Sequence, residues 1–419
     1  MDGREYLETH PWITFSHVAN YSELWALLGE AFSKVRHLAG APLQPRLAHE
    51  LGDIYMVKGA LATTAIEGNT LTEAEAFEIL SDRKKLPESR AYLEQEIRNV
   101  YKALNEVRLN AVTGQPFTLS AEWVCQQNAA VLRDLPVEAH VDPGRFRTVG
   151  VVAGNYRGAP AEDVPYLVEQ LTNWLNLAWL SPSAEADAPE DMLFFRAFFA
   201  ATLAHLYLAW IHPFGDGNGR TARLVEAAIL AHSGVVPWVA CNLLSDHYNK
   251  TRAVYYQRLD AASRRNDVDG FIGYAARGFV DSLREQIDTV QHMQKTTAWV
   301  NYVHEIIGRE PAGETRERRR KLVLCLKEGE AITKSGVRRL DFDLSEMYRG
   351  KSDKTITRDF NKLVELGLVR FDGSTYTSAI DVMDAFLTIH SDKASPERNI
   401  LTLLSQRQPS AGGNPRRKN

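Results

Sequence analysis

The feature that most constrains the fold is a long apolar segment that ends in a glycine-rich loop. Residues 192–211 are almost wholly apolar, and residues 212–223 read HPFGDGNGRTAR. A segment of this length fits either a membrane span or the central helix of a globular core. It contains Arg196, Thr202 and His205 and runs directly into a charged loop. We therefore interpret it as a fully buried helix, and we expect no membrane partner.

Most of the first 310 residues also have helical periodicity. Apolar residues recur at intervals of three and four, and a capping box formed by Thr72 and Glu75 marks one helix start. The exception is the segment 144–160, where β-branched residues between glycines predict a short β-hairpin near 147–158. The predicted fold class is therefore all-α with one small hairpin. The expected helices are 21–38, 47–66, 72–80, 88–109, 120–132, 165–177, 192–211, 218–232, 247–264 and 268–308.

The charge of the chain changes near a predicted linker at residues 309–313. Residues 1–315 carry a net charge of −11, whereas residues 316–377 carry +5. Two modules with different partners are expected on this ground. The second has a winged-helix pattern, with helices at 318–326, 344–349 and 353–366 and then two strands around an Asp-Gly turn.

The third helix of this module would present polar and basic side chains away from its apolar face, as a major-groove helix does. These side chains are Lys354, Thr355, Thr357, Arg358, Asn361 and Lys362. The module's modest positive charge leaves two interpretations open, DNA binding and a protein-docking or dimerising role. The domain boundaries that we expect are 1–110, 111–308 and 316–390, with a disordered basic tail at 391–419.

The cysteines and the N-terminus indicate a compartment. Cys125, Cys241 and Cys325 are far apart and form no CxxC pair, which argues against a disulfide scaffold or a thiolate zinc site. The first five residues contain no apolar stretch of the kind that a secretory signal needs. We expect a cytoplasmic protein.

Residues 212–223 gather the groups that a phosphate-handling site needs. Glycines let backbone N–H groups approach a ligand closely, and a helix N-terminus attracts anions. Arg220 and Arg223 are three apart, so both can face one polyphosphate, and Asp216 is a carboxylate suited to Mg²⁺. His212 is the general base available at neutral pH. A zinc site would lack a third ligand, and no Gly-Lys-Ser/Thr follows a strand as in a Walker-type NTPase.

The same segment resembles the signature of the Fic family, H-x-F-x-D/E-G-N-G-R-x-x-R, at every position. The resemblance extends over roughly residues 20–300. It implies an all-α core with a hairpin "flap", and transfer of AMP from ATP to a hydroxyl of a target protein. The flap, at about 147–158, would align the target segment by strand addition.

The resemblance also implies a role for each signature residue. His212 would deprotonate the incoming Ser, Thr or Tyr hydroxyl, and Asp216 would hold Mg²⁺ on the α- and β-phosphates. The nucleotide-binding residues that it implies are Gly217, Asn218, Gly219, Arg220, Thr221, Ala222 and Arg223, with Tyr255 or Tyr256 near the adenine. The intact Gly219 favours AMP transfer over the phosphorylation carried out by the kinase-like branch of the family. Transfer of another nucleotide or of phosphocholine stays open.

A second match lies upstream of the signature. Residues 63–68 read TTAIEG and resemble the family's inhibitory motif, S/T-x-x-x-E-G/N. Thr63 and Glu67 are four apart and share one face of a helix. The resemblance implies that Glu67 pairs with Arg223 and displaces the γ-phosphate of ATP, so that the chain inhibits itself.

These observations favour a Mg²⁺- and ATP-dependent protein adenylyltransferase that is inhibited by Glu67 and modifies a target protein or itself. Two alternatives stay open. One is a DNA-binding regulator whose Fic-like part senses nucleotide without turnover. The other is a hydrolase that removes AMP, with Glu67 aligning a water molecule. Formation of a homodimer is also left open.

Overall fold

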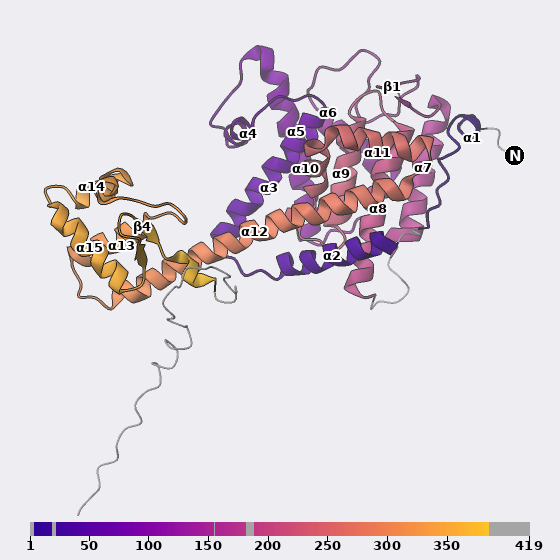
Figure 1. Ribbon diagram of the computed structural model, residues 1–419. Coiled ribbons are helices and arrows are strands. Elements are labelled where there is room, and N and C mark those ends of the chain that lie inside the picture. The colour runs from indigo at the N-terminus through magenta and orange to yellow at the C-terminus, as the bar shows by residue number, and fades with distance from the viewer. Residues whose placement is uncertain (1–3, 19–21, 155, 182–187, 385–419) are drawn as a thin grey trace, which may run out of the picture. The chain divides into compact units, whose positions relative to one another are not determined.

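The computed structural model describes residues 4–18, 22–154, 156–181 and 188–384. The described residues form two compact units, which divide between Val290 and Gln291 (Figure 1). The division falls inside the long helix α12 (Val268–Gly308), whereas the predicted linker, 309–313, is the non-helical segment that follows α12. The physical reason is that the last turns of α12 carry Trp299, Val303 and Ile307 into the apolar core of the second unit.

Over its described residues the first unit is helical apart from one small hairpin, which confirms the predicted all-α class. Its helices before α12 are α1 (Tyr6–Thr9), α2 (Ser22–Ala39), α3 (Pro45–Ile66), α4 (Glu73–Leu80), α5 (Ala91–Val112), α6 (Ala121–Leu132), α7 (Val164–Leu175), α8 (Glu190–Ile211), α9 (Asn218–Ala231), α10 (Leu243–Lys250) and α11 (Arg252–Arg264).

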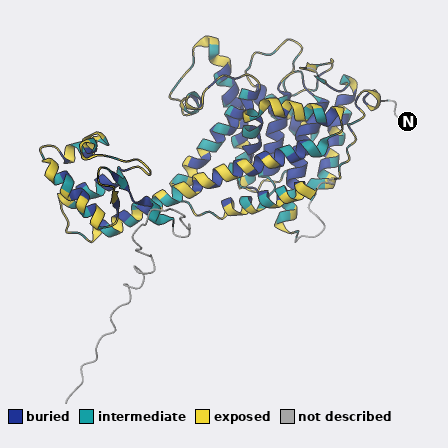
Figure 2. Cartoon of the chain, viewed as in Figure 1, coloured by how far each residue is buried: buried dark blue, intermediate teal, exposed yellow. Residues whose placement is uncertain are grey.

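The apolar segment forms the central helix α8, as predicted. By length and composition α8 could cross a membrane, but 72% of its most apolar window is buried inside the protein. It packs against α2, α7, α9 and α11, and the dark blue residues in Figure 2 show how completely this region is enclosed. Because α9 follows α8 after a short loop and packs along it, the glycine-rich loop is held between two buried helices.

Local signals explain where several helices begin and end. The predicted capping box is present at α4, where the Thr72 side chain accepts from the Glu75 N–H and the Glu75 side chain accepts from the Thr72 N–H. The single helix predicted at 247–264 is wrong, since the chain breaks between α10 and α11 at Thr251 (φ −116°, ψ 34°). The Thr251 hydroxyl and the Thr251 N–H both donate to the His247 carbonyl, at 2.7 and 3.0 Å, so the hydroxyl supplements the last helical bond of α10.

The predicted hairpin is present but short. Strands β1 (Val152–Ala153) and β2 (Tyr156–Arg157) pair antiparallel, with Val152 opposite Arg157. The three cysteines are unpaired, as expected.

The second unit contains the predicted three helices and a hairpin. These are α13 (Glu314–Leu324), α14 (Phe342–Met347), α15 (Asp353–Glu365), β3 (Val369–Phe371) and β4 (Tyr376–Ser378). Strands β3 and β4 pair antiparallel, and Ile332 adds a bridge to Tyr376 on the other side of β4. A buried Arg318–Asp359 pair at 2.7 Å ties α13 to α15. The assignment as a winged helix stays a prediction, and the predicted tail 391–419 lies outside the described residues.

Candidate active site

His212 caps the C-terminal end of α8 in the left-handed conformation, with φ 51° and ψ 60°. Its Nδ1 lies 3.3 Å from the carbonyl oxygen of Ala209. Because a carbonyl can only accept, Nδ1 carries the proton, and the lone pair of the neutral ring is on Nε2. Burial lowers the pKa of His212 below its usual value, so the ring is neutral at pH 7. The residue therefore has the state that a general base requires.

The loop after His212 is shaped by two asparagine side chains. Asn218 Oδ1 accepts from the Phe214 N–H at 2.9 Å, and Asn218 Nδ2 donates to the Phe214 carbonyl at 2.8 Å. Asn128 Nδ2, from α6, donates to the Asp216 carbonyl at 2.9 Å. Gly217 has φ 76°, and a Cβ there would lie 3.0 Å from Asn128 Nδ2. The Asn218 side chain thus fixes the conformation of the loop, and both of its polar atoms are used within the protein. The groups left to donate to an anion are the backbone N–H groups at the start of α9.

Asp216 is half exposed at the mouth of this loop. Its Oδ1 accepts from the Gly217 N–H at 2.5 Å and lies 3.0 Å from Arg220 Nη2. Among the described residues no group of three or more His, Cys, Asp or Glu side chains could hold a metal ion. The donor set fits Mg²⁺, which is commonly bound by one or two carboxylates together with substrate phosphates.

Arg220 is buried and held by two carboxylates. Its Nη1 lies 2.7 Å from Glu96 Oε1 on α5, and Asn69 Nδ2 donates to the other Glu96 oxygen at 2.8 Å. Burial raises the pKa of Glu96, although Arg220 and Asn69 act in the opposite direction. Sequence reasoning gave Glu96 no role, because one acid on a helix of ordinary charge pattern carries no signal of its partner. The neighbouring Thr221 and Ala222 are buried in the helix packing, where Thr221 Oγ1 accepts from Asn128 Nδ2 at 3.2 Å.

Arg223 and Glu67 form the pair that the sequence predicts. Arg223 Nη2 lies 2.6 Å from Glu67 Oε1 and donates to the Thr63 carbonyl at 3.0 Å. Arg223 is 1% exposed, whereas Glu67 caps the C-terminal end of α3. Burial raises the pKa of Glu67, but the Arg223 guanidinium, with smaller contributions from Arg220 and His212, lowers it; the net shift is downward, so the carboxyl is ionised at neutral pH. Thr63 contacts the arginine through its backbone carbonyl.

The two candidate adenine tyrosines differ sharply in exposure. Tyr255 is 3% exposed, and its ring stacks on Tyr248 with centroids 4.8 Å apart. Tyr256 is 46% exposed, with the Arg252 guanidinium 5.9 Å from its ring centroid. Of the two, Tyr256 is the one whose ring is open to a ligand.

The hairpin is anchored to the signature by Arg147, which is 4% exposed. Its Nε donates to the His212 carbonyl at 2.7 Å, and Nη2 donates to the carbonyls of Ile211 and Ala159 at 3.2 and 2.5 Å. Nη1 donates to the Val149 carbonyl at 2.7 Å. The bonds to Ile211 and His212 satisfy carbonyls that the end of α8 leaves without helical partners, and those to Val149 and Ala159 hold the segments on either side of the hairpin. Sequence reasoning placed Arg147 at the start of the predicted hairpin but missed this function, since a single arginine beside a predicted strand has the pattern of an exposed residue.

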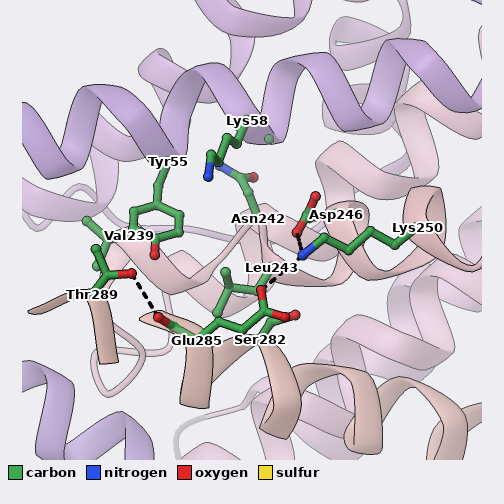
Figure 3. Close-up of a pocket in the computed structure, with 11 residues that line it drawn as sticks. Tyr55, Lys58, Val239, Asn242, Leu243, Asp246, Lys250, Ser282, Glu285 and Thr289 are labelled. Atoms are coloured by element: carbon green, nitrogen blue, oxygen red, sulfur yellow. Dashed lines mark hydrogen bonds and ion pairs between the residues drawn. The ribbon is translucent and has the colours of Figure 1, made fainter. Parts of the chain in front are cut away.

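A pocket elsewhere in the first unit contains none of the signature residues. It lies between α3, α10 and α12, N-terminal to Glu67 along α3 (Figure 3). Lys250 spans one side of it, 2.9 Å from Asp246 and 3.0 Å from Glu285. Its charged groups are therefore already paired, and the pocket is not part of the candidate site.

The chain has recognisable relatives. Residues 118–230 match the profile of the Fic/DOC family. The chain is 28% identical over 256 residues to protein adenylyltransferase fic-1 of Caenorhabditis elegans, covering 61% of this chain and 45% of that protein. It is 29% identical over 216 residues to protein adenylyltransferase Fic of Nematostella vectensis, covering 51% of this chain and 45% of that one. The chain thus spans about half the length of the curated relatives that it matches.

Solved structures show the same fold. A Fic family protein from Desulfovibrio desulfuricans G20 superposes with a TM-score of 0.53 at 19% identity, covering 90% of this chain and 98% of that one. A fragment of Fic-1 from Caenorhabditis elegans superposes with a TM-score of 0.52 at 24% identity, covering 65% of this chain and 74% of the fragment. These structures share the helical fold of this chain, and the complete signature lies within that fold at residues 212–223. The chain therefore contains a domain of the Fic/DOC family at residues 118–230.

Proposed function

We propose that this protein transfers AMP from ATP to a hydroxyl of a target protein. The observation that carries the proposal is the position of His212, a neutral base with a free Nε2, directly before a loop that opens the anion-binding N-terminus of α9. The relatives named above are protein adenylyltransferases, which supports the same activity.

In the proposed reaction His212 Nε2 takes the proton of the incoming Ser, Thr or Tyr hydroxyl. The hydroxyl oxygen then attacks the α-phosphorus, an O–P bond forms, and the bond from the α-phosphorus to its bridging oxygen breaks. Pyrophosphate leaves with the electron pair of that bond. The N–H groups at the start of α9 stabilise the charge on the phosphates. The β-hairpin, which Arg147 holds against the end of α8, would pair with an extended target segment.

Mg²⁺ is part of the proposal. Asp216 would hold the ion through its carboxylate, and the ion would supply charge stabilisation to the phosphates. The half-exposed position of Asp216 and its place at the mouth of the loop support this assignment.

We further propose that the protein is self-inhibited. The Glu67 carboxylate is bound to Arg223, the residue assigned to the γ-phosphate. Because this carboxylate is tethered to the same chain, its effective concentration is on the order of millimolar, and it competes with the γ-phosphate of ATP. ATP that binds without Arg223 would have its α-phosphate out of line with the attacking hydroxyl. A misplacement of about 1 Å can cost roughly a hundredfold in rate.

The decisive experiment compares two labelled nucleotides on the Glu67→Gly variant. Incubation with α-labelled ATP and Mg²⁺ should label a protein band, whereas γ-labelled ATP should not, and omission of Mg²⁺ should abolish labelling. Label from γ-labelled ATP would indicate a kinase and contradict the proposal. Mass-spectrometric detection of an AMP adduct identifies the target, including the chain itself.

The same experiment separates the alternatives. A nucleotide-sensing DNA regulator would bind ATP and label nothing, and its DNA affinity would fall steeply with salt. A hydrolase would release AMP from a modified target. The ionised Glu67, bound to Arg223 and with a lowered pKa, is a weak base for water in this state, which weighs against hydrolysis.

A further inference from the structure

Arg220 has contacts that the proposed reaction leaves unexplained. It is 7% exposed and lies between two carboxylates. Its Nη1 lies 2.7 Å from Glu96 Oε1 on α5, and its Nη2 lies 3.0 Å from Asp216 Oδ1. Two acidic partners weaken the attraction of an arginine for phosphate, because each of them repels the phosphate. The contacts therefore point to a role for Arg220 beyond anion binding.

Glu96 is itself held on both of its oxygens. It is 8% exposed, and Asn69 Nδ2 donates to Glu96 Oε2 at 2.8 Å. The orientation of the Asn69 amide is fixed, since Nδ2 also donates to the Leu93 carbonyl at 3.1 Å and Oδ1 accepts from the Leu71 N–H at 3.1 Å. Each oxygen of Glu96 therefore faces a donor, as an ionised carboxylate requires. Glu96 is a fixed anchor for one end of the Arg220 guanidinium.

The other end of the guanidinium determines which oxygen of Asp216 is free. Asp216 Oδ1 accepts from the Gly217 N–H at 2.5 Å and contacts Arg220 Nη2. Asp216 Oδ2 takes part in no hydrogen bond or ion pair with the part of the chain that the structure describes, and the side chain is 48% exposed. Oδ2 is therefore the carboxylate oxygen that a cation can reach.

A guanidinium that met Asp216 alone would bind it differently. Arginine and carboxylate groups frequently pair through two parallel N–H···O bonds, which would occupy both Oδ1 and Oδ2 of Asp216. Glu96 opposes this arrangement, because it holds the Nη1 end of the guanidinium on α5. Glu96 also balances the charge of Arg220, so that the negative charge of Asp216 still attracts a cation. The free Oδ2 therefore depends on Glu96.

We infer that Glu96 is a positioning residue for the cation site, because it holds Arg220 on a single oxygen of Asp216 and so leaves Oδ2 free for Mg²⁺. The inference rests on the proposed function, in which Asp216 holds this ion. Without the Glu96 carboxylate, the guanidinium can turn both of its amino groups toward Asp216 and compete with the ion. Binding of ATP without metal does not use Oδ2, so it should not weaken.

The test measures Kd for ATP by isothermal titration calorimetry, once with excess Mg²⁺ and once with EDTA. The full chain carries Glu67→Gly to remove inhibition and His212→Ala to prevent turnover. Adding Glu96→Gln, which removes the charge at nearly constant shape, should lower the preference for Mg²⁺-bound ATP over metal-free ATP by about tenfold, as for other residues that orient a metal ligand. The matched control is Glu106→Gln, the same change at an exposed position about 15 Å further along α5, which should leave the preference unchanged.

The outcomes separate the inference from the function on which it rests. An unchanged preference in Glu96→Gln, or an equal weakening of both Kd values, would overturn the inference alone, and the second result would show that Glu96 holds Arg220 for phosphate. If the parent protein itself binds ATP equally with and without Mg²⁺, Asp216 does not hold the ion, and both fall. Should Glu96→Gln fail to fold, Glu96→Asp takes its place, because it keeps the charge but is one carbon too short to reach Arg220. A reduced preference for Mg²⁺-bound ATP supports the inference, and an unchanged one refutes it.

Discussion

The Glu67 carboxylate occupies the space that a side chain on Gly219 would need: a Cβ added to Gly219 would lie 2.1 Å from Glu67 Oε1. The same Cβ would lie 3.0 Å from Arg223 Nη1. The contact between Glu67 and Arg223 therefore passes directly over the backbone of α9, and it requires a residue without a side chain at that position. The second signature glycine does more than admit a phosphate, because it also admits the carboxylate that competes with the phosphate.

This relationship predicts strong coupling between substitutions at the two positions. Gly219→Ala alone should destabilise the protein by about 1–2 kcal/mol, since Glu67 must leave a charged partner to make room. In the Glu67→Gly background only the end of the Arg223 side chain, at 3.0 and 3.2 Å, crowds the added Cβ, so Gly219→Ala should cost much less, and the preference of alanine for a helix offsets part of that cost. Urea denaturation of the double-mutant cycle measures the coupling. Additive effects would show that the carboxylate does not occupy this space in solution.

Removal of the Glu67 carboxylate should activate AMP transfer. Glu67→Gly frees Arg223 for the γ-phosphate, and the rate should rise by one to two orders of magnitude, as the cost of a misaligned phosphate suggests. Transfer of label from α-labelled ATP, at one ATP and Mg²⁺ concentration, measures the effect. Equal rates in wild type and variant would exclude inhibition by this residue.

Two companion variants test whether the effect comes from the pair. Thr63→Pro should also activate, because proline interrupts the last turns of α3 that carry Glu67. Arg223→Ala should not activate, since it releases Glu67 but also removes the phosphate partner. Higher transfer in Arg223→Ala than in wild type would assign the arginine a different role.

The sequence predicted the parts of this site that are local, and missed those that depend on long-range packing. The order of His212, Asp216 and Arg223 and the helical periodicity around them were enough to predict the loop between two helices. The Glu67–Arg223 contact joins residues 156 positions apart, and only a family resemblance suggested it. The resemblance supplied a pairing that periodicity cannot supply, because α3 and α9 are brought together by tertiary packing.

Glu96 and Arg147 show why the remainder was out of reach. Each is a single charged residue in an ordinary amphipathic context, and each becomes specific only through its partners, Arg220 for Glu96 and four carbonyls for Arg147. The break at Thr251 was missed for a related reason. Threonine is tolerated in helices, and its identity gives no local signal that the backbone leaves the helical conformation there.

The pH dependence of transfer should reflect the buried state of His212. Burial lowers its pKa, an effect that Arg147 strengthens, whereas the carbonyl of Ala209 and the charges of Glu67 and Asp216 oppose it. A lowered pKa keeps the ring neutral and basic at lower pH, so the acid limb of the rate profile should lie below pH 6.5, the usual histidine value. Initial rates of the Glu67→Gly protein from pH 5 to 8 measure the limb. A midpoint at or above pH 7 would contradict the assignment.

His212→Ala in the same background should reduce transfer by about 10²–10⁴-fold, the range for loss of a general base. His304→Ala, which changes an exposed histidine of α12, is the control and should leave both the rate and its pH profile intact. Retention of activity in His212→Ala would remove His212 as the base.

Arg147 should be essential for the stability of the hairpin and for the rate. Lysine cannot reproduce a planar fork that serves several carbonyls at once, so Arg147→Lys should cost about 2–4 kcal/mol of unfolding free energy. Transfer should fall while ATP affinity holds, because the His212 carbonyl loses its donor but the start of α9 is unchanged. Denaturation and calorimetry check the two parts. The control is Arg145→Lys, since the Arg145 side chain is 78% exposed and pairs only with Asp142 among the described residues.

The close packing of α3 against α10 should set the strength of inhibition. A Cβ at Gly59 would lie 2.6 Å from the Asn242 Cβ, at the edge of the pocket in Figure 3. Gly59→Ala should therefore push α3 outward and draw Glu67, two turns further along, away from Arg223. The expected result is a loss of about 1–3 kcal/mol of stability, the usual cost of overpacking, together with a several-fold rise in AMP transfer. Gly29→Ala on α2 meets no atom within 4 Å and should change neither quantity. If Gly59→Ala lowers stability but does not raise AMP transfer, the Glu67–Arg223 contact persists when α3 is displaced, and inhibition does not depend on the packing of α3.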